Sequence, residues 1–484
     1  MLYNSVLFIT VFLPIVMIGW FLLNRFNRIG LAKWFVIGMS FWFYGYFNLS
    51  YIFILLGSLL FNYSVYLCRN RAAGKIAKAL TIFGVAGNLA LLFYYKYMNF
   101  FVDNINAIFK TDIFIEKILL PLGISFFTFQ QISFLIDTHK DGVRYKFTDY
   151  AFFITFFPQL VAGPIVTHDE LIPQLEKKFS FSAENCFDGL ARFTIGLSKK
   201  VLLADTLAVI TNAEFNNIAY LDLPTAWLSG ICYMLQLYFD FSGYSDMSVG
   251  LGKLLGFDLP ENFNSPLTAT SVKDFWRRWH ITLSRFMGKY IYIPLGGSRC
   301  GKRKQCFNLF IVFLLSGIWH GAEWTFVVWG IIHGVFVIFE TIRGRKLFKN
   351  DHLNRIITFI AVTFSFVIFR CENMSDALMM IQKMFAGGFH NRFTGMCNCL
   401  YISENYALLK ANEILGLPFA NLIFIVSFCL LMLISFLFIW RGPRAKDWIE
   451  KKALTTKGIV TLAALFTWSF ISLSKVSEFL YFNF

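Results

Sequence analysis

Charged side chains are scarce in this sequence. Asp, Glu, Lys and Arg make up only 15% of its 484 residues, whereas 57% are hydrophobic and Phe alone occurs 60 times. Because charged residues form about a quarter of an ordinary soluble domain, this composition excludes a water-soluble protein. A helix of about 20 apolar residues crosses a bilayer with its backbone hydrogen bonds satisfied. The composition therefore predicts an all-α, polytopic integral membrane protein.

Motifs of several common enzyme classes are also absent. The nine cysteines form no C-x-x-C pair, so neither a disulfide framework nor a zinc site is expected. The sequence has no HExxH, no other spacing of three metal ligands, no glycine-rich phosphate loop and no G-x-S-x-G turn. We therefore expect no metal and no bound cofactor, and any chemistry must rely on side chains such as histidine.

The net charge of +15 lies mainly in short loops between apolar runs. The basic loops cover residues 25–33, 69–78, 299–304, 343–349 and 441–446. Such loops mark the cytoplasmic side of a membrane protein, whereas a nucleic-acid-binding surface needs a soluble face with interleaved aromatic residues. We expect contact with membrane lipid, no nucleic-acid partner, and an N-terminus outside the cytoplasm.

Apolar windows that could cross a membrane recur along the chain. They lie at residues 5–23, 31–47, 50–67, 79–98, 113–136, 150–166, 187–210, 225–256, 307–340, 355–370, 420–440 and 458–474. Since window 307–340 is long enough for two passes, the sequence predicts about 11–13 membrane helices. Windows 113–136 and 150–166 contain Pro, Gly and Gln. They are either kinked helices or re-entrant elements around a central funnel.

The stretch SGIWHGAEWTF at residues 316–326 places His320 and Glu323 inside an apolar window. An ionisable group in a membrane is costly and is a functional candidate by default. Because basic loops flank the window on both sides, it predicts a hairpin with its turn at residues 317–321. His333 lies 13 residues beyond His320, so it need not face the same cavity, and a packed, hydrogen-bonded histidine is the simpler explanation.

A second dense region, SVKDFWRRWHITLSRFMGKYIYIPLGGSR, begins at residue 271. Ser271 and Asp274 have the spacing of a capping box, which predicts the start of a helix. An apolar stripe follows, surrounded by basic residues, as is typical of a helix in the membrane interface. The stripe comprises Phe275, Trp279, Phe286 and Tyr290, with Trp276 and His280 beside it. This helix is either a plain interfacial anchor or one that turns His280 toward a lipid headgroup or an acyl carrier.

Polar residues also crowd the otherwise apolar run LQLYFDFSGYSDMSVG. They are Asp240, Ser242, Tyr244, Ser245 and Asp246. Such groups are either hydrogen-bonded between helices or face a polar funnel that shields two neighbouring carboxylates from lipid. The sequence leaves both interpretations open.

Together, these motifs resemble the membrane-bound O-acyltransferase (MBOAT) family, in the bacterial branch typified by the membrane subunit of alginate O-acetylation. The resemblance rests on FSGYSDMSVGLGKLLGFDLPENFNSPL, FWRRWHITLSRF, YIYIPLGGSR and SGIWHGAEWTFVVWGIIHG in this order. LPLGISFFTFQQISFLIDTHK, FFPQLVAGPI and LSKKVLLADT upstream agree with it, as does VIFRCENMSDALMMIQKMF downstream, so that it covers residues 1–390. One departure is that Gly288 and Lys289 stand where this branch usually carries an Arg-Asp pair.

The resemblance implies that His320 is the catalytic residue and that His280 is a second functional histidine. It also implies a cytoplasmic thioester donor, such as acetyl-CoA or an acyl carrier, and a periplasmic or cell-surface partner of the SGNH acetyltransferase type. Further candidates for lining the site or its funnel are Trp319, Glu323, Trp324, Asp240, Ser242, Tyr244, Asp246, Trp276, Asn262, Asn264 and Gln130. The expected location is the bacterial cytoplasmic membrane.

A single domain is expected over residues 1–484. We divide it into N-terminal helices over residues 1–110, a catalytic core over 111–371, and an outer loop with C-terminal helices over 372–484.

A buried histidine suits acyl transfer on physical grounds. A thioester is already activated, so the reaction needs a base for the attacking hydroxyl and donors for the oxyanion rather than a metal. Burial favours the neutral imidazole of His320, which can accept that proton. We expect Gly317 and Gly321 to let the acceptor approach the backbone. We expect Trp319 and Trp324 to keep out water that would hydrolyse the donor.

The sequence therefore predicts an O-acyltransferase that moves an acyl group, most often acetyl, to an extracytoplasmic polysaccharide such as alginate, peptidoglycan, cellulose or a capsule. One alternative is a transporter or flippase of an envelope precursor, which also uses broken helices and buried charges; the lack of an inverted repeat disfavours it. Another is D-alanyl transfer to teichoic acid. A subunit without chemistry is disfavoured because His280 and His320 are both present.

Overall fold

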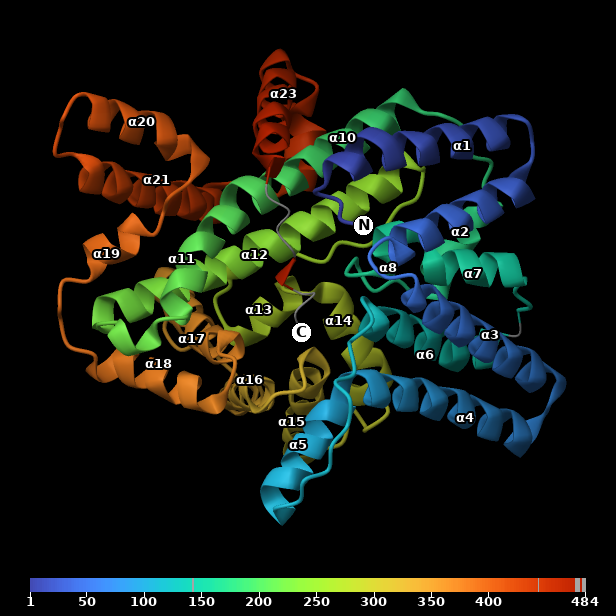
Figure 1. Cartoon of the computed structure of the whole chain (residues 1–484). Coiled ribbons are helices and arrows are strands. Elements are labelled where there is room, and N and C mark those ends of the chain that lie inside the picture. Colours follow the sequence, from blue (N-terminus) through green and yellow to red (C-terminus); the bar gives the residue numbers. More distant parts are fainter. Residues whose placement is uncertain (142, 443, 475–478, 481–484) are drawn as a thin grey trace. The chain divides into compact units, whose positions relative to one another are not determined.

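The helical, multi-pass prediction is confirmed. The computed structural model describes residues 1–141, 143–442, 444–474 and 479–480, and every regular element in that part of the chain is a helix (Figure 1). Six segments of the described residues are long and apolar enough to cross a membrane. They are Phe8–Arg25, Ser50–Arg71, Gly74–Phe109, Trp324–Arg343, Asp351–Arg370 and Ala420–Arg441. The other apolar windows contain helices that are shorter or more polar, and two of these windows are helical over only part of their length.

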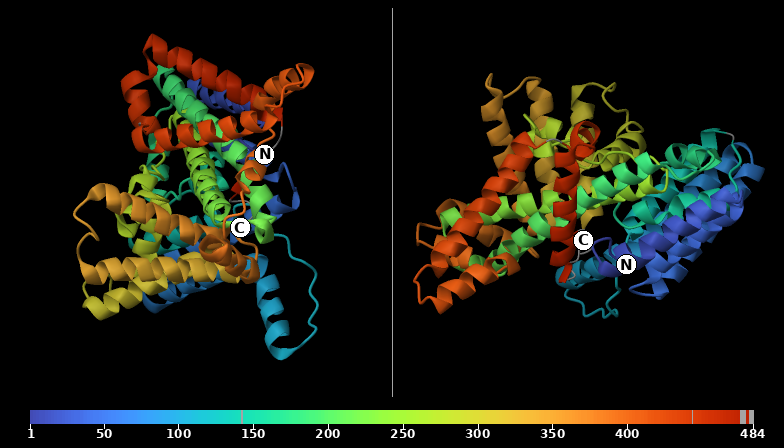
Figure 2. Two further views of the ribbon diagram at one scale, coloured as in Figure 1. Left: turned by 90° about the vertical axis from the view of Figure 1, so that its left-hand side faces the viewer. Right: turned by 90° about the horizontal axis from the view of Figure 1, so that it is seen from above.

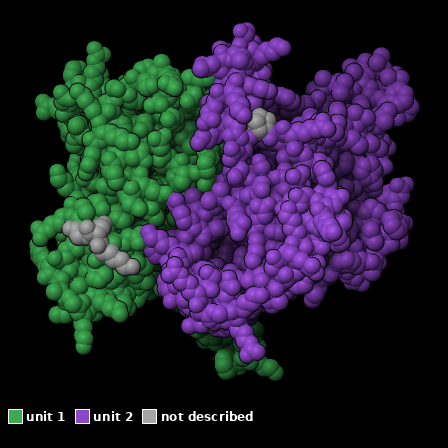
Figure 3. Space-filling view, turned by 180° about the vertical axis from the view of Figure 1, so that it is seen from behind, with its two compact units in different colours: residues 1–194, 244–261, 481–484 green, residues 195–243, 262–480 purple. Residues whose placement is uncertain are grey.

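The chain divides into two compact units (Figure 3). Among the described residues, unit 1 holds residues 1–194 and 244–261, and unit 2 holds residues 195–243 and 262–480. The long helix α12 (Leu223–Leu254) contributes residues to both units.

Unit 1 is built around the N-terminal helices. These are α1 (Leu13–Arg25), α2 (Ile29–Gly45), α3 (Ser50–Arg71), α4 (Gly74–Leu92), α5 (Met98–Phe109), α6 (Ile124–Asp141), α7 (Phe147–Thr155), α8 (Phe157–Leu160), α9 (His168–Leu171) and most of α10 (Ala183–Ser198). Asn62 of α3 and Asn88 of α4 are buried, and their amides exchange hydrogen bonds of 3.1 and 2.6 Å. Side-chain amides of this kind hold apolar helices together where no hydrophobic force does.

The window 113–136 is only partly helical. Residues 111–120 are extended and return alongside α5 (Figure 2, left, cyan), and the helix α6 begins only at Ile124. Pro121 and Gly123, whose φ is +71°, separate the two parts. The amides of Asn99 and Asn106 donate hydrogen bonds of 3.0 Å to the carbonyls of Ile118 and Ile113, and so hold the extended part. The interpretation of this window as one kinked helix is therefore wrong.

The window 150–166 has a broken backbone. Helix α7 ends at Thr155, the extended ψ of 106° at Phe156 interrupts it, and the four-residue α8 follows. The side chains on both sides of the break are buried. The irregular backbone is thus enclosed by protein, which is the condition for such a break in an apolar protein.

Unit 2 contains the remaining helices. Besides part of α12, these are α11 (Asp205–Phe215), α13 (Val272–Arg278), α14 (Ile281–Met287), α15 (Lys302–His320), α16 (Trp324–Arg343), α17 (Asp351–Arg370), α18 (Met374–Ala386), α19 (Phe393–Asn398), α20 (Ser403–Ile414), α21 (Ala420–Arg441), α22 (Ala445–Trp448) and α23 (Thr456–Ile471). In Figure 1, α15 and α16 lie side by side as the predicted hairpin.

The hairpin differs from its prediction at the turn. The turn comprises residues 321–323, because α15 continues through Gly317 to His320. A Cβ atom on Gly317 would lie 2.4 Å from the carbonyl oxygen of Phe326, and one on Gly321 would lie 2.0 Å from the Phe326 ring. The space beside both glycines is therefore filled by α16. The expectation that they leave room for an acceptor is wrong; they allow two helices to approach closely.

The predicted interfacial helix after Ser271 is also different. Ser271 does cap α13 by accepting a 3.1 Å hydrogen bond from the backbone N–H of Asp274. The helix then ends at Arg278, and His280 has a left-handed backbone with φ of +44° before α14 begins. Trp279 and His280 are buried in unit 2. A continuous amphipathic helix with His280 at a membrane surface is thus wrong.

We predict that Gly330→Ala destabilises the hairpin. The new Cβ would meet the carbonyl oxygen of Phe313 at 2.6 Å and the Cα of Gly317 at 3.1 Å, so α15 and α16 must separate. Overpacking of this kind costs about 1–3 kcal/mol. The midpoint of thermal unfolding of the detergent-solubilised protein measures the loss. Gly57→Ala, in α3 with no atom within 4 Å of the new Cβ, is the control and should leave the midpoint unchanged or raised.

Candidate active site

His320 occupies the last position of α15, at the tip of the hairpin. Only 5% of its surface is exposed. Its ring lies 4.9 Å from the ring of Trp319, 5.1 Å from that of Trp329 and 5.5 Å from that of Phe369. The close approach of α15 and α16 brings Trp329 against this ring, and α17 supplies Phe369. His320 is therefore an imidazole enclosed by aromatic side chains.

Trp319 connects this histidine with the second one. Its ring centroid lies 6.3 Å from that of His280 and 4.9 Å from that of His320. The two histidines to which the resemblance gives a function are 40 residues apart in the sequence. They thus contact the same indole ring in unit 2.

His280 is fully buried, and its environment determines its tautomer. Its Nδ1 lies 3.1 Å from Oδ1 of Asn262. The backbone N–H and the hydroxyl of Thr282 donate to the same oxygen, at 3.3 and 3.0 Å, so this atom is the amide oxygen and accepts hydrogen bonds. Nδ1 must therefore carry the proton, which leaves the lone pair on Nε2. Burial lowers the pKa of His280 to about 3, so the ring is neutral at physiological pH.

His333 has a structural role, as the simpler explanation expected. The indole N–H of Trp276 donates a 3.1 Å hydrogen bond to its Nδ1, and its Nε2 lies 2.8 Å from the hydroxyl of Ser365. That hydroxyl donates at 2.7 Å to the carbonyl of Val362, so Nε2–H is the donor to Ser365. Both ring nitrogens are occupied, and His333 holds α13, α16 and α17 together.

Helix α16 makes a further contact with α13. The carboxylate of Glu340 accepts hydrogen bonds from the backbone N–H groups of Val272 and Lys273, at 2.7 and 2.9 Å. A negative group at a helix N-terminus satisfies otherwise unpaired donors and favours the helix dipole. Helix α16 thus makes three contacts: Trp329 with His320, His333 with Trp276, and Glu340 with the start of α13.

Asp240 is neutralised by an ion pair. The ammonium group of Lys200 lies 2.6 Å from Asp240 and 2.8 Å from Asp205, and the backbone N–H of Leu480 donates to Asp240 at 2.9 Å. Lys200 also lies over the ring of Phe479, 4.6 Å from its centroid. Sequence analysis did not identify Lys200 as the partner of Asp240. The two adjacent lysines at positions 199 and 200, inside the apolar window 187–210, could have indicated a buried cation.

Asp246, in unit 1, is also neutralised by an ion pair. Nη2 of Arg192 lies 3.0 Å from Asp246 and also pairs with Glu261 at 2.5 Å. Tyr244 belongs to unit 1 as well and stacks on Tyr3 with ring centroids 4.7 Å apart. Ion pairs and packing therefore account for much of the polar cluster on α12 without a funnel.

The remaining candidates are dispersed. Ser242 and Gln130 are buried, the latter on α6 in unit 1. Asn264 is exposed and accepts a hydrogen bond of 3.1 Å from Arg444. Glu323 is exposed at the start of α16. Trp324, the next residue, is 52% exposed, so the expectation that Trp324 excludes water is wrong. Trp329 and Phe369 enclose His320 instead, because α16 turns Trp324 outward.

The site combines two buried histidines, a shared indole ring and a buried amide. Nδ2 of Asn262 is buried and has no hydrogen-bond partner within the described residues. Within the same part of the chain, no three His, Cys, Asp or Glu side chains gather as metal ligands. The groups present can accept a proton and donate hydrogen bonds to a developing negative charge, which are the requirements of acyl transfer.

Comparison with known proteins agrees with this chemistry. The model of the membrane-bound O-acyltransferase family matches residues 36–381. A peptidoglycan O-acetyltransferase of Helicobacter pylori is 37% identical over 100% of this chain and 98% of its own length. A probable alginate O-acetylase of Pseudomonas aeruginosa is 38% identical over 80% of this chain and 75% of its own. A teichoic acid D-alanyltransferase of Bacillus subtilis is 28% identical over 51% of this chain and 67% of its own.

The matched region contains α12, the His280 segment and the α15–α16 hairpin. The transporter interpretation is therefore set aside. This chain is an acyltransferase and belongs to the membrane-bound O-acyltransferase family.

Proposed function

We propose that this protein moves an acetyl group from a cytoplasmic thioester across the bacterial cytoplasmic membrane for O-acetylation of a cell-surface glycan. The observation that carries the proposal is the contact of two buried histidines, His320 and His280, with the one indole ring of Trp319. Peptidoglycan is the first acceptor to test, because the relative named for it aligns with the whole chain, whereas the relative named for alginate aligns with 80% of it.

His320 acts as the general base in this mechanism. Its neutral imidazole takes the proton of the attacking hydroxyl, and the hydroxyl oxygen forms a bond to the thioester carbonyl carbon. The tetrahedral intermediate then expels the sulfur as the C–S bond breaks. The proton passes from His320 to that sulfur, so the products are an O-ester and a free thiol. General-base catalysis of this kind contributes about 10²–10⁴-fold.

Asn262 supports the charged intermediate and orients His280. The amide of Asn262 fixes His280 in the Nδ1–H form, and its own buried Nδ2 donors are available to an oxyanion or to an acceptor hydroxyl. The aromatic side chains around His320 exclude water, which would otherwise compete as a nucleophile. Trp329 and Phe369 provide this enclosure.

The direction of transfer follows from the basic loops. The basic segment 299–304 lies at the start of α15, and the basic segment 343–349 lies at the end of α16. This supports a hairpin that starts and ends at the cytoplasm with His320 at its far end. The same reasoning supports an N-terminus outside the cytoplasm. Acetyl-CoA or an acyl carrier serves as the donor, and an SGNH-type acetyltransferase outside the membrane is the partner that completes transfer to the glycan.

His320→Ala is predicted to abolish transfer while the protein stays folded. In the native host, ester-linked acetate released by alkali from purified surface glycans should fall to the level of a deletion strain, because the base is lost. The control is His352→Ala, an exposed histidine on α17, which should keep wild-type acetate. Unchanged ester acetate in every glycan, with the variant present in the membrane, would falsify the proposal. A loss of ester-linked D-alanine instead would identify the alternative acyl group.

Asn262→Ala is predicted to lower the turnover number more than it raises KM. The change removes the acceptor that fixes the tautomer of His280, and loss of such orienting groups costs about 10–100-fold. Initial rates of thioester cleavage by the purified protein in lipid nanodiscs measure the effect. Asn264→Ala removes an exposed amide two residues away and should leave both constants unchanged. If Asn262→Ala changed the turnover number no more than Asn264→Ala does, His280 would have no part in the reaction.

A further inference from the structure

A hollow of about 600 Å³ lies along the second half of α1 in unit 1, and we call it the α1 groove. The helix forms one wall, and residues 178–181, which precede α10, form the other. The lining residues are Met17, Ile18, Phe21, Leu22, Asn24, Arg25, Lys178, Phe179, Ser180 and Phe181. The volume is in the range of sites that enclose part or all of a small ligand.

Both walls of the α1 groove are held in place by aromatic packing. The ring of Phe179 is buried, with its centroid 4.8 Å from that of Trp20 and 4.7 Å from that of Phe257. The ring of Phe181 meets that of Phe21 edge to face at 5.7 Å. These contacts belong to unit 1 alone. The groove is therefore part of the packed structure of this unit, and not an incidental gap beside a loop.

The apolar part of the groove opens toward lipid. It lies on the segment Phe8–Arg25, which is long and apolar enough to cross a membrane. Ile18 is 66% exposed and Leu22 is 50% exposed. Apolar side chains that are exposed on a membrane-spanning helix meet hydrocarbon chains instead of water. A ligand that enters here must therefore carry a hydrocarbon chain.

The end of the groove is positively charged. Arg25, the last residue of α1, and Lys178 both line it, and none of its lining residues is acidic. The side chains of Arg25 and Lys178 form no ion pair or hydrogen bond with another residue that the structure describes. Lys33, in the same basic loop, is by contrast paired with Asp149 at 2.6 Å. Two cations without acidic partners create a local potential that attracts an anion.

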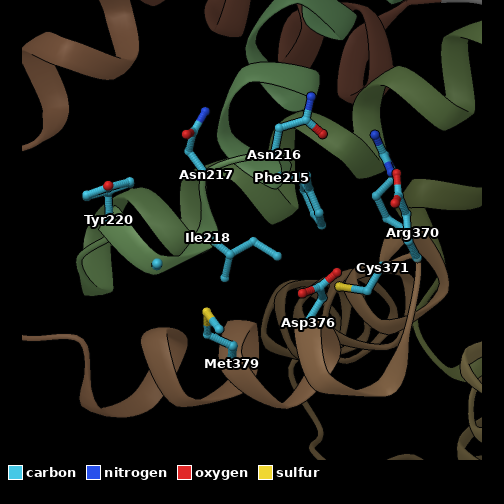
Figure 4. A pocket seen from close by; sticks show the side chains of 11 residues that line it. Phe215, Asn216, Asn217, Ile218, Tyr220, Arg370, Cys371, Asp376 and Met379 are labelled. Carbon is cyan, nitrogen blue, oxygen red and sulfur yellow. The ribbon is translucent and has the colours of Figure 1, made fainter.

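A polar hollow of about 410 Å³ in unit 2 has a different charge balance (Figure 4). There Arg370 is accompanied by the carboxylates of Glu372 and Asp376. Nη2 of Arg370 also donates a 3.1 Å hydrogen bond to Oδ1 of Asn212. Because the acids outnumber the base, this hollow would repel an anion. The α1 groove instead joins an apolar lining to positive charge.

We propose that the α1 groove binds one anionic phospholipid, with its phosphate beside Arg25 and Lys178 and an acyl chain along Ile18 and Leu22. Guanidinium and ammonium groups donate charge-assisted hydrogen bonds to phosphate oxygens, and the hydroxyl of Ser180 can donate another. Arg25 begins the basic loop 25–33, which is expected at the cytoplasmic face, where anionic lipids attract such residues. This inference does not rest on the proposed function, since acyl transfer makes no use of the groove.

The lining distinguishes this ligand from related ones. A zwitterionic phospholipid also has a phosphate, but its ammonium group would be repelled by the two cations. A free phosphate ester would leave the apolar part of the groove unfilled and gain nothing from it. A bound anionic lipid contacts both α1 and the segment before α10, and it stabilises the folded protein by mass action.

Native mass spectrometry of the delipidated, full-length protein in detergent tests the proposal. The probes are phosphatidylglycerol and phosphatidylethanolamine with the same acyl chains, and we expect one phosphatidylglycerol to bind first and more tightly. Arg25→Gln and Lys178→Gln should each weaken it by about fivefold, the effect of one basic residue near an anionic headgroup. Lys75→Gln and Lys78→Gln, at exposed positions of α4 outside the groove, are the matched controls and should bind as the wild type does.

Thermal unfolding separates loss of charge from loss of structure. Without added lipid, all variants should unfold at the wild-type temperature, and phosphatidylglycerol should raise this temperature less in the two groove variants than in the controls. Lys178→Arg keeps the charge and should bind the lipid as the wild type does. If Lys178→Arg binds as weakly as Lys178→Gln, the charge is not what holds the ligand and the assignment is overturned.

Three further results would also overturn the assignment. The first is equal affinity of the wild type for the two phospholipids. The second is an equal loss of binding in the groove variants and the α4 controls, which would indicate diffuse attraction to the whole basic face. The third is displacement of the bound lipid by glycerol phosphate at a similar concentration, which would indicate a site for a free anion.

Discussion

The contact between Gly317 of α15 and Gly330 of α16 sets the spacing on which the candidate site depends. Each glycine faces a backbone carbonyl of the other helix, at a distance where a Cβ atom would clash. This close approach carries Trp329 to the ring of His320, and α17 then completes the enclosure with Phe369. In an apolar environment no hydrophobic force distinguishes helix from lipid, so such small-residue contacts determine which helices pair.

Buried charges follow a similar logic. Asp240 and Asp246 stand within two turns of one another on α12, and each has a cation from a neighbouring helical segment. A charge that is paired and hydrogen-bonded can remain in an apolar interior, whereas removal of one partner leaves the other without compensation. Histidines are arranged differently: neutral rings need only hydrogen bonds, and this lets His280 remain fully buried.

The sequence predicted the helical class and the hairpin, because these depend on hydropathy and on local spacing. The catalytic roles of His320 and His280 stay predictions. The sequence could not predict the break at His280, since a capping box and an apolar stripe fit a continuous helix equally well. Gly317 and Gly321 were expected to make room for a substrate, whereas they allow α15 and α16 to pack closely. A sequence does not show which surface a glycine faces. The pairing of Asp240 with Lys200 depends on the tertiary structure, as does the outward position of Trp324.

The contacts along α16 have a consequence for how this helix can change during evolution. One stripe of this helix faces the site: Trp329 contacts His320, His333 contacts Trp276, and Glu340 contacts the start of α13. The three residues of the stripe lie at intervals of four and seven residues. Inserting or deleting one residue between them would rotate part of the stripe by about 100°. The helix would still be apolar and would still insert into lipid. Its length is thus constrained by the site and not by the membrane, and we expect insertions to be confined to the loops at its ends.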